Sequence, residues 1–229
     1  MFSVILLKIL KEGYFILLTI VMFISMVSFS HNVFNFDKAK QKVAQFEHTL
    51  KDLKGVIKTD SVRQHAIFKI SRIIEQYNNK LNPQKKYEIA NLINNMSIKY
   101  TNLDVDLICA TITHESALTW QPDIISPAGA IGLMQIMPST GLFLSKHESI
   151  RWTNEKDILF NPIYNIRLGC RYLSMLIEMY HLDGGLAAYN GGERRAAMWL
   201  ASGRDNEVLL EETRDYIPAV LKLYDIFKN

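Results

Sequence analysis

The chain has 229 residues, of which 48% are hydrophobic and 21% charged, and its formal net charge is +3. This length leaves room for one ordinary domain and an appendage, and the apolar content predicts a globular core rather than a disordered chain. Because the net charge is small and Lys and Arg are spread along the chain, we expect no nucleic-acid partner.

The amino-terminal segment is the first feature in chain order. Lys8 and Lys11 precede an uncharged run from Tyr14 to Ser30. This pattern predicts export, with either a retained inner-membrane anchor or a signal peptide cleaved near Ser28-Phe29-Ser30. The run exceeds the roughly 7–15 apolar residues of a signal peptide, which favours the anchor. We therefore expect an anchor over residues 1–35 and a functional part in the periplasm.

A short heptad pattern follows, with Lys and Glu between its apolar members. Those members are Phe36, Ala39, Val43, Phe46, Leu50, Leu53 and Ile57. The pattern predicts a helix that could form a coiled-coil stalk or lay its apolar stripe on the next domain. About three heptads are few for a coiled coil, so packing is favoured. We assign residues 36–84 to a helical stalk and linker that could also bind a partner in a cell-envelope machine.

Interruptions are expected along this stalk. Gly55 and Thr59-Asp60-Ser61 should break the first helix, and a second should run from Val62 to Tyr77. The polar stretch from Asn78 to Lys86 contains Pro83 and is predicted to be a linker.

Residues 85–229 have a dense helical pattern, and we expect one mainly α domain with an irregular lobe. Asp104 or Asp106 should cap a helix that ends near Ser116, and residues 119–130 should form a loop or short strand. Further helices are expected from Asn161-Pro162 to Gly184-Gly185 and from Glu211 to Phe227, with another break at Gly191-Gly192.

Cys109 and Cys170 are the two cysteines, and both fall within apolar helical patterns. They could pair in an oxidising compartment, but the simpler interpretation is that each is a small buried hydrophobe. Their spacing and that of the histidines match no metal site, so we expect neither a metal nor a cofactor.

Glu115 is the first candidate for chemistry. Ile108, Ile112 and Glu115 share one face of the predicted helix, and that helix is rich in apolar residues. A carboxyl group at the end of a buried face is partly desolvated, so its pKa rises and it can donate a proton near neutral pH. Sequence position alone also allows an ordinary solvated acid.

The glycine-rich stretch from Ser126 to Gln135 strengthens the case for a ligand site. Gly129 and Gly132 allow a tight turn and close approach of the backbone to a ligand. Gln135 offers a donor and an acceptor that suit sugar hydroxyls and acetamides, and Met137 supplies apolar surface.

Four ordered motifs carry a resemblance to a known family over about Tyr87 to Phe227. They are Glu115-Ser116, Gly132 to Gln135 with Pro138 and Thr140, Ala188-Tyr189-Asn190-Gly191-Gly192, and Glu212-Thr213-Arg214-Asp215-Tyr216. The segment from Asn165 to Leu173 also resembles that family's central helix. The chain is thus similar to the soluble-lytic-transglycosylase-like enzymes of the lysozyme superfamily.

The resemblance implies a lysozyme-like fold and a lyase that degrades peptidoglycan glycan strands. Glu115 would protonate the β-1,4 bond after N-acetylmuramic acid and then, as a base, assist closure of a 1,6-anhydro ring. Ser116 would stabilise the catalytic loop at the substrate site. Ser126, Gln135, Met137, Tyr189 and Asn190 would line the glycan groove. Tyr216, or in competition Tyr224, would orient Glu115, while Glu212 would be a buried structural acid that bonds to backbone or Arg214.

One departure from the family pattern is a loop from Leu118 to Ile125 that is longer by about two residues. Trp120 on this loop could stack on a sugar or anchor the loop. Asp123 could serve as a second carboxylate, which would permit a hydrolytic lysozyme reaction instead. A non-catalytic peptidoglycan-binding scaffold is a further alternative, and the acid at position 115 argues against it.

Overall fold

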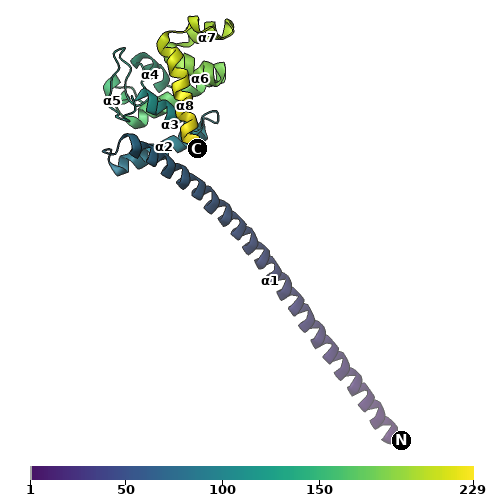
Figure 1. The fold of residues 1–229 in the computed structure, drawn as a ribbon. Coiled ribbons are helices and arrows are strands. Elements are labelled where there is room, and N and C mark those ends of the chain that lie inside the picture. The colour runs from purple at the N-terminus through teal and green to yellow at the C-terminus, as the bar shows by residue number, and fades with distance from the viewer. Residues whose placement is uncertain (1) are drawn as a thin grey trace. The chain divides into compact units, whose positions relative to one another are not determined.

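The computed structural model describes the backbone of residues 2–229 and the side chains of residues 15, 18–29, 38 and 40–229. Figure 1 shows a chain built of helices. In order they are α1 (Phe2–Tyr77), α2 (Pro83–Lys99), α3 (Val105–Glu115), α4 (Pro138–Ser145), α5 (Glu155–Leu159), α6 (Pro162–Gly191), α7 (Glu193–Ala201), the 3-10 helix η1 (Asn206–Val208) and α8 (Glu211–Lys228). The chain divides into two compact units, Met1–Asp60 and Ser61–Asn229.

Extended structure is confined to an irregular loop between α3 and α4. Isolated antiparallel bridges join Ile125 to Ile131 and Ile131 to Ile136, and residues 2–229 contain no longer strand. The expected irregular lobe is therefore present, and the expectation of a mainly α chain is confirmed.

Helix α1 is continuous from Phe2 to Tyr77, so the expected interruptions at Gly55 and at residues 59–61 are wrong. The Thr59 hydroxyl donates a hydrogen bond to the carbonyl of Gly55 at 3.0 Å, which lets this poor helix former remain within the helix. Gly55 lowers helix stability by roughly 1 kcal/mol relative to Ala but imposes no turn.

The first unit consists of residues 1–60 of this helix. Its described apolar side chains are exposed, including Val43, Phe46, Leu50 and Leu53 of the heptad pattern. Among the residues searched, no helix is both long and apolar enough to cross a membrane. Much of the expected anchor lies outside that set, because the side chains of residues 1–14, 16–17 and 30–37 are not described.

The second unit begins at Ser61, earlier than the domain start that we expected at residue 85. The reason is the apolar face near the end of α1, where Ile67, Ile70 and Ile74 are almost fully buried. These side chains belong to the same hydrophobic core as the later helices, so the last turns of α1 are part of the compact unit.

Local capping explains where α2 and α3 begin. The side chain of Asn82 accepts a hydrogen bond from the backbone N–H of Gln84, and Pro83 occupies the first helical position. Residues 83–86 are therefore helical rather than part of a linker. Asp104, the first of our two candidates, caps α3 by accepting from the N–H of Leu107 at 2.8 Å.

Helix α6 begins as expected, with Asn161 as its cap and Pro162 at its first position. The predicted end at Gly184-Gly185 is wrong, because both glycines are buried inside the helix. A Cβ atom on Gly185 would lie 2.8 Å from the backbone of Ile177, so packing explains this glycine. The break falls at His181, whose φ is 61°, and the helix ends before Gly192.

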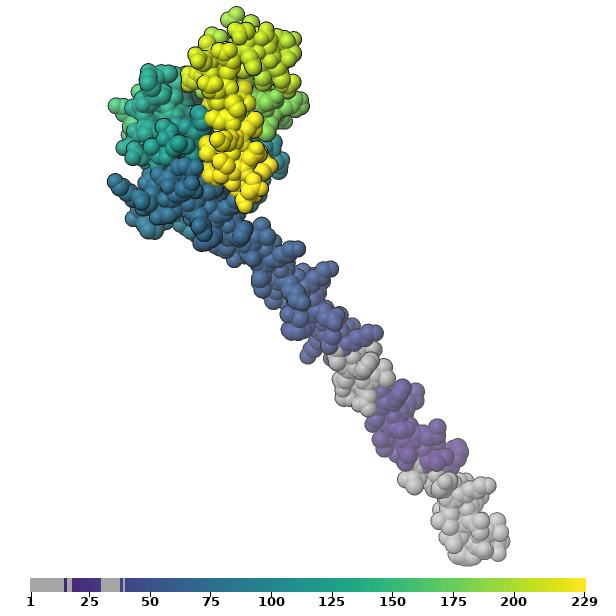
Figure 2. Space-filling view, viewed as in Figure 1, coloured from purple at the N-terminus to yellow at the C-terminus, as the bar shows by residue number. Residues whose placement is uncertain are grey.

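Helix α8 closes the core of the second unit by packing against α3 and α6. Its buried side chains include Thr213, Tyr216 and Val220. Figure 2 shows α8 in yellow along the surface of this unit. The packing brings residues near position 215 to the carboxyl end of α3.

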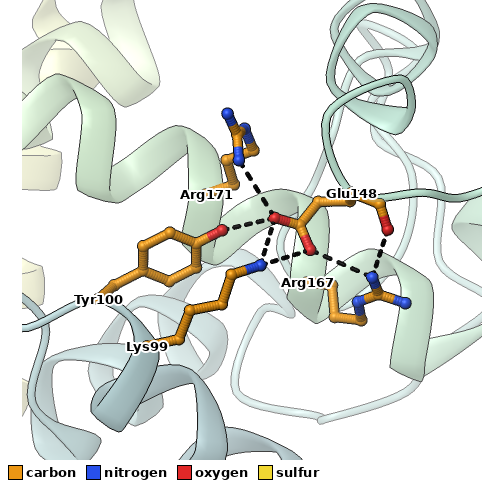
Figure 3. Close-up of polar contacts among 5 residues, drawn as sticks. All are labelled: Lys99, Tyr100, Glu148, Arg167 and Arg171. Atoms are coloured by element: carbon orange, nitrogen blue, oxygen red, sulfur yellow. Dashed lines mark hydrogen bonds and ion pairs between the residues drawn. The ribbon is translucent and has the colours of Figure 1, made fainter.

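A buried acid ties the loop after α4 to two helices, as Figure 3 shows. The side chain of Glu148 is fully buried, and its carboxylate accepts hydrogen bonds from Lys99 at 2.6 Å and from the Tyr100 hydroxyl at 2.6 Å. Arg167 and Arg171 of α6 approach the same carboxylate at 3.2 and 3.4 Å. Burial raises the pKa of Glu148, but the bonds from Lys99, Tyr100 and Arg167 outweigh it, so the pKa is lowered overall.

Candidate active site

Glu115 is the last residue of α3 and is partly buried. Burial raises the pKa of its carboxyl from 4.5 to about 7. A contact with Tyr216 lowers the pKa, while the charge of Glu212 raises it further. Near neutral pH a substantial fraction of this acid therefore holds its proton, as a general acid requires.

Tyr216 of α8 faces the same carboxyl. It is 2% exposed, and its ring packs edge-on against His114 with the centroids 4.8 Å apart. Its hydroxyl forms no hydrogen bond within the usual geometric limits, yet it is near enough to Glu115 for each to shift the other's pKa. Tyr224 is directed elsewhere, because its hydroxyl bonds to Asp104. Of the two candidates, Tyr216 is the one beside Glu115.

The glycine-rich turn is held by a buried asparagine of α6. The side-chain oxygen of Asn165 accepts from the N–H of Met134 at 2.8 Å, and its amide donates to the carbonyls of Ile131 and Leu159. Gly132 has φ 82°, and a Cβ there would lie 2.3 Å from the Leu159 carbonyl oxygen. A side chain cannot fit at this position, so the turn requires glycine.

The carboxyl end of α6 completes the site. The hydroxyl of Tyr189 donates to the carbonyl of Met134 at 2.7 Å, and burial together with the charge of Glu115 raises the Tyr189 pKa. The side chain of Asn190 accepts from the Thr213 hydroxyl at 2.7 Å, which links α6 to α8.

This arrangement can perform proton transfer at a single carboxyl group. Tyr189 and Tyr216 are near enough to the acid for its charge to raise their pKa values, and Tyr189 bonds to the glycine-rich turn that contains Gln135. Among the side chains that the structure describes, no cluster of three His, Cys, Asp or Glu could hold a metal ion.

Comparison with known proteins identifies the family. The family described as "Transglycosylase SLT domain" matches residues 91–208, a little over half of the chain. The chain belongs to this family.

Curated relatives of this SLT domain protein include two from Escherichia coli. The soluble lytic murein transglycosylase is 37% identical over 128 residues, which are 52% of this chain and 19% of the relative. The membrane-bound lytic murein transglycosylase D is 31% identical over 142 residues, 58% of this chain and 30% of the relative. The chain thus matches less than a third of the length of either relative.

Solved structures agree with the fold. An inactive mutant of the lytic transglycosylase Slt from Pseudomonas aeruginosa is 30% identical and superposes with a TM-score of 0.53, over 59% of this chain and 23% of that one. A 70-kDa soluble lytic transglycosylase in complex with bulgecin A is 30% identical and superposes with a TM-score of 0.51. The match covers 63% of this chain and 26% of that one. The mainly α, lysozyme-like fold expected for the SLT domain is thereby confirmed.

The other groove residues expected from the sequence differ in their surroundings. Ser116 is fully buried, and its hydroxyl accepts from the N–H of Trp120, so it supports the loop from within. Ser126 accepts from the N–H of Ala130 at 3.0 Å. Gln135 is partly buried and donates to the Gly132 carbonyl at 2.8 Å, while Met137 is 41% exposed.

The expectations for Glu212 in the SLT domain need correction. Glu212 is exposed rather than buried. It lies in the first turn of α8, where an acid interacts favourably with the helix dipole. Its contact is with Asn190 at 3.5 Å, whereas Arg214 pairs with Glu207. Asp123 is exposed on its loop, and the acid whose charge raises the Glu115 pKa is Glu212.

Trp120 is 1% exposed, so it anchors the loop and does not offer a face to a sugar. Its indole N–H donates to the hydroxyl of Thr113. No role was predicted for Thr113 or Thr213, although Thr213 stands in one of the quoted motifs, and Asn165 was cited only through the family resemblance. Thr113 lies two positions before Glu115 and Thr213 directly after Glu212, but their bonds to Trp120 and Asn190 depend on how the chain folds, so their positions were a weak signal. Asn78, which contacts Trp120, gave no signal at all.

Cys109 and Cys170 are both fully buried and unpaired in the structure. Burial raises the pKa of each thiol well above its ordinary value. A raised pKa keeps these groups as neutral thiols, which pack as small hydrophobes.

Proposed function

We propose that this protein is a peptidoglycan lytic transglycosylase and that Glu115 is its only catalytic acid and base. Membership of the SLT family supports the reaction class, and the relatives are named as lytic murein transglycosylases. The observation that carries the proposal is the Glu115 carboxyl, buried at the end of α3 with its pKa raised to about 7.

The proposed reaction begins with protonated Glu115 at the β-1,4 bond between N-acetylmuramic acid and N-acetylglucosamine. Its proton passes to the bridging oxygen as the bond from that oxygen to C1 of the muramic acid breaks. The resulting carboxylate then takes the proton of the C6 hydroxyl while the C6 oxygen attacks C1. A 1,6-anhydro ring closes, the acid is regenerated and no water is consumed.

The groove residues have separate roles in this proposal. Tyr216 holds the carboxyl of Glu115 in place during the two proton transfers. Tyr189, through its bond to the Met134 carbonyl, fixes the glycine-rich turn next to the acid. Ser126, Gln135, Met137 and Asn190 contact the glycan, and the free side-chain oxygen of Gln135 is suited to an acetamide N–H.

Substitution of Glu115 tests the proposal. We expect Glu115→Gln to keep its fold and to lose nearly all release of soluble muropeptides from purified sacculi, since the amide cannot donate the proton. Asp123→Asn is the matched control: it removes an exposed acid of the loop that follows Glu115 and is expected to keep most of the activity. Release by the Glu115 variant at a rate close to that of the unchanged protein would contradict a single-acid mechanism.

The location that fits this substrate is the periplasm. We propose that the segment before the heptad pattern directs export, either as an inner-membrane anchor or as a cleaved signal. We also propose that the exposed apolar stripe of residues 43–57 binds a partner in a cell-envelope machine. The intact mass of the protein recovered from membranes distinguishes an anchor from a cleaved signal. A chain starting at Met1 supports an anchor, and one starting near residue 31 contradicts it.

A further inference from the structure

The turn that follows Glu115 has a strained backbone. Ala117, Leu118 and Trp120 have φ values of 49°, 62° and 50°. These values lie in the left-handed region, which is unfavourable for residues other than glycine. Such a conformation persists only where surrounding contacts hold it, and it is common at functional sites. The contacts that hold this turn therefore also determine how Glu115 is presented.

Trp120 supplies the first set of these contacts. Its side chain is 1% exposed, so the ring is anchored in the core. The indole N–H donates to the Thr113 hydroxyl at 2.9 Å, and the backbone N–H donates to the Ser116 hydroxyl at 3.0 Å. Thr113 and Ser116 stand on either side of Glu115 in the sequence, so both bonds close the turn around the acid.

Asn78 supplies a contact to this turn from a distant part of the chain. Its side-chain amide donates to the carbonyl oxygen of Trp120 at 3.2 Å, across 42 residues of sequence. Asn78 directly follows α1, and its backbone N–H bonds to the carbonyl of Ile74 at 2.7 Å, so α1 fixes its position. It also lies outside the residues 91–208 that match the SLT family.

We propose that Asn78 and Trp120 are positioning residues for Glu115. Trp120 holds the strained turn after the acid through its buried ring and its hydrogen bonds, and Asn78 holds Trp120 at the end of α1 through the bond to its carbonyl. The final turns of α1 therefore help to position Glu115, because they fix the place of Asn78. The inference rests on the proposed function for its kinetic test, and a second test is independent of activity.

Loss of the Asn78 contact is expected to change the pKa of Glu115. Burial is the largest cause of its raised pKa, so a turn that relaxes and admits water lowers that pKa toward its ordinary value. The other polar groups that face this region are His114 of α3, Tyr189 of α6, and Tyr216 and Glu212 of α8. Loss of the hydrogen bond from Asn78 to the Trp120 carbonyl removes none of these groups.

The kinetic test uses the full chain with Asn78→Ala, Asn78→Asp and Trp120→Phe, and Asn79→Ala as the matched control at the next, exposed position. Asn78→Asp keeps the size of the side chain and removes the donor to the Trp120 carbonyl but adds a negative charge, so Asn78→Ala is the variant used to read the pH dependence. We expect kcat to fall about threefold to tenfold, as for loss of one hydrogen bond, with KM unchanged within about twofold. In Asn78→Ala the alkaline limb of the pH profile of kcat/KM should move to lower pH, and the control should match the unchanged protein.

A purely structural role would give a different result. Asn78 variants with a lower melting temperature but an unchanged kcat and an unchanged alkaline limb would overturn the proposal. If Trp120→Phe fails to fold, the two Asn78 variants still decide the matter.

The second test needs no turnover, so failure of the proposed function can be told apart from failure of this one. The stability gained at pH 8 from Glu115→Gln reports how strongly the fold disfavours an ionised Glu115. We expect that gain to be smaller in the Asn78→Ala background, which removes the donor without adding a charge, than in the unchanged protein. Equal gains in the two backgrounds would overturn the positioning role even if the chain released no muropeptides.

Discussion

Two acids lie near the proposed reaction centre, and their surroundings separate their roles. Glu115 ends a helix whose residues from Asp106 to Thr113 are buried, so its carboxyl is largely desolvated and a substantial fraction of it keeps its proton near neutral pH. Glu212 lies exposed in the first turn of α8, and its charge raises the pKa of Glu115 further. The contrast between a desolvated acid and an exposed one favours Glu115 as the proton donor.

The same pKa shift makes a prediction about stability. Folding raises the pKa of Glu115 from 4.5 to about 7, so the unfolded chain releases this proton at a lower pH than the folded one. The unchanged protein should lose stability as the pH rises through this window, and Glu115→Gln should not. We expect the two to be equally stable at pH 4 and the variant to be more stable by about 2–3 kcal/mol at pH 8. Denaturant unfolding at the two pH values measures this difference, and equal stabilities at pH 8 would contradict the shift.

At the scale of helices, the starts were predicted better than the breaks. Asp104 and the Asn161-Pro162 pair cap their helices as the sequence indicated, because a cap bonds to a backbone N–H only two or three residues away. Gly184-Gly185 was mistaken for a stop, since the sequence does not show the side chains of Ile177 and Leu200 that pack where a Cβ would lie.

In the site too, features set by local sequence were predicted and features set by distant contacts were not. Glu115, Tyr189 and Tyr216 could be named in advance because they stand in ordered motifs. The buried state of Trp120 and its bond to Asn78 could not, because that contact joins residues 42 positions apart. The exposure of Glu212 was also hidden, since it depends on how α8 packs.

The cluster around Glu148 is a contact between elements that carries its own prediction. Glu148→Gln removes the charge while Lys99, Arg167 and Arg171 remain, so we expect a loss of about 3–5 kcal/mol at pH 7. Exposed Glu178→Gln on α6 is the matched control and should change stability by less than about 0.5 kcal/mol. Chemical unfolding of the full chain measures both.

The pH dependence of this loss has a definite sign. Because the lysine, tyrosine and arginine contacts hold the pKa of Glu148 below its ordinary value, the ionised acid stabilises the fold above the pKa of the unfolded chain. This contribution disappears as the pH falls through the lower pKa of the folded state. The gap between Glu148→Gln and the unchanged protein should narrow on acidification, and a constant gap would contradict the account.

At the scale of the whole molecule, α1 is shared by the two compact units. Its residues up to Asp60 form the first unit, whereas Ser61–Tyr77 contribute buried isoleucines to the core of the second. The heptad pattern correctly indicated a helix, but the extent of the second unit depended on a core that local sequence does not reveal. A protein trimmed to begin at residue 85 would lack both these isoleucines and Asn78.

The most direct test of the central claim is the mass of the products released from purified sacculi by the full-length protein. Our account predicts muropeptides that end in 1,6-anhydro-muramic acid and are lighter by one water than the corresponding reducing forms. Reducing ends would contradict it, because they require a water molecule and a second group to activate it. Glu212 would then be the acid to examine.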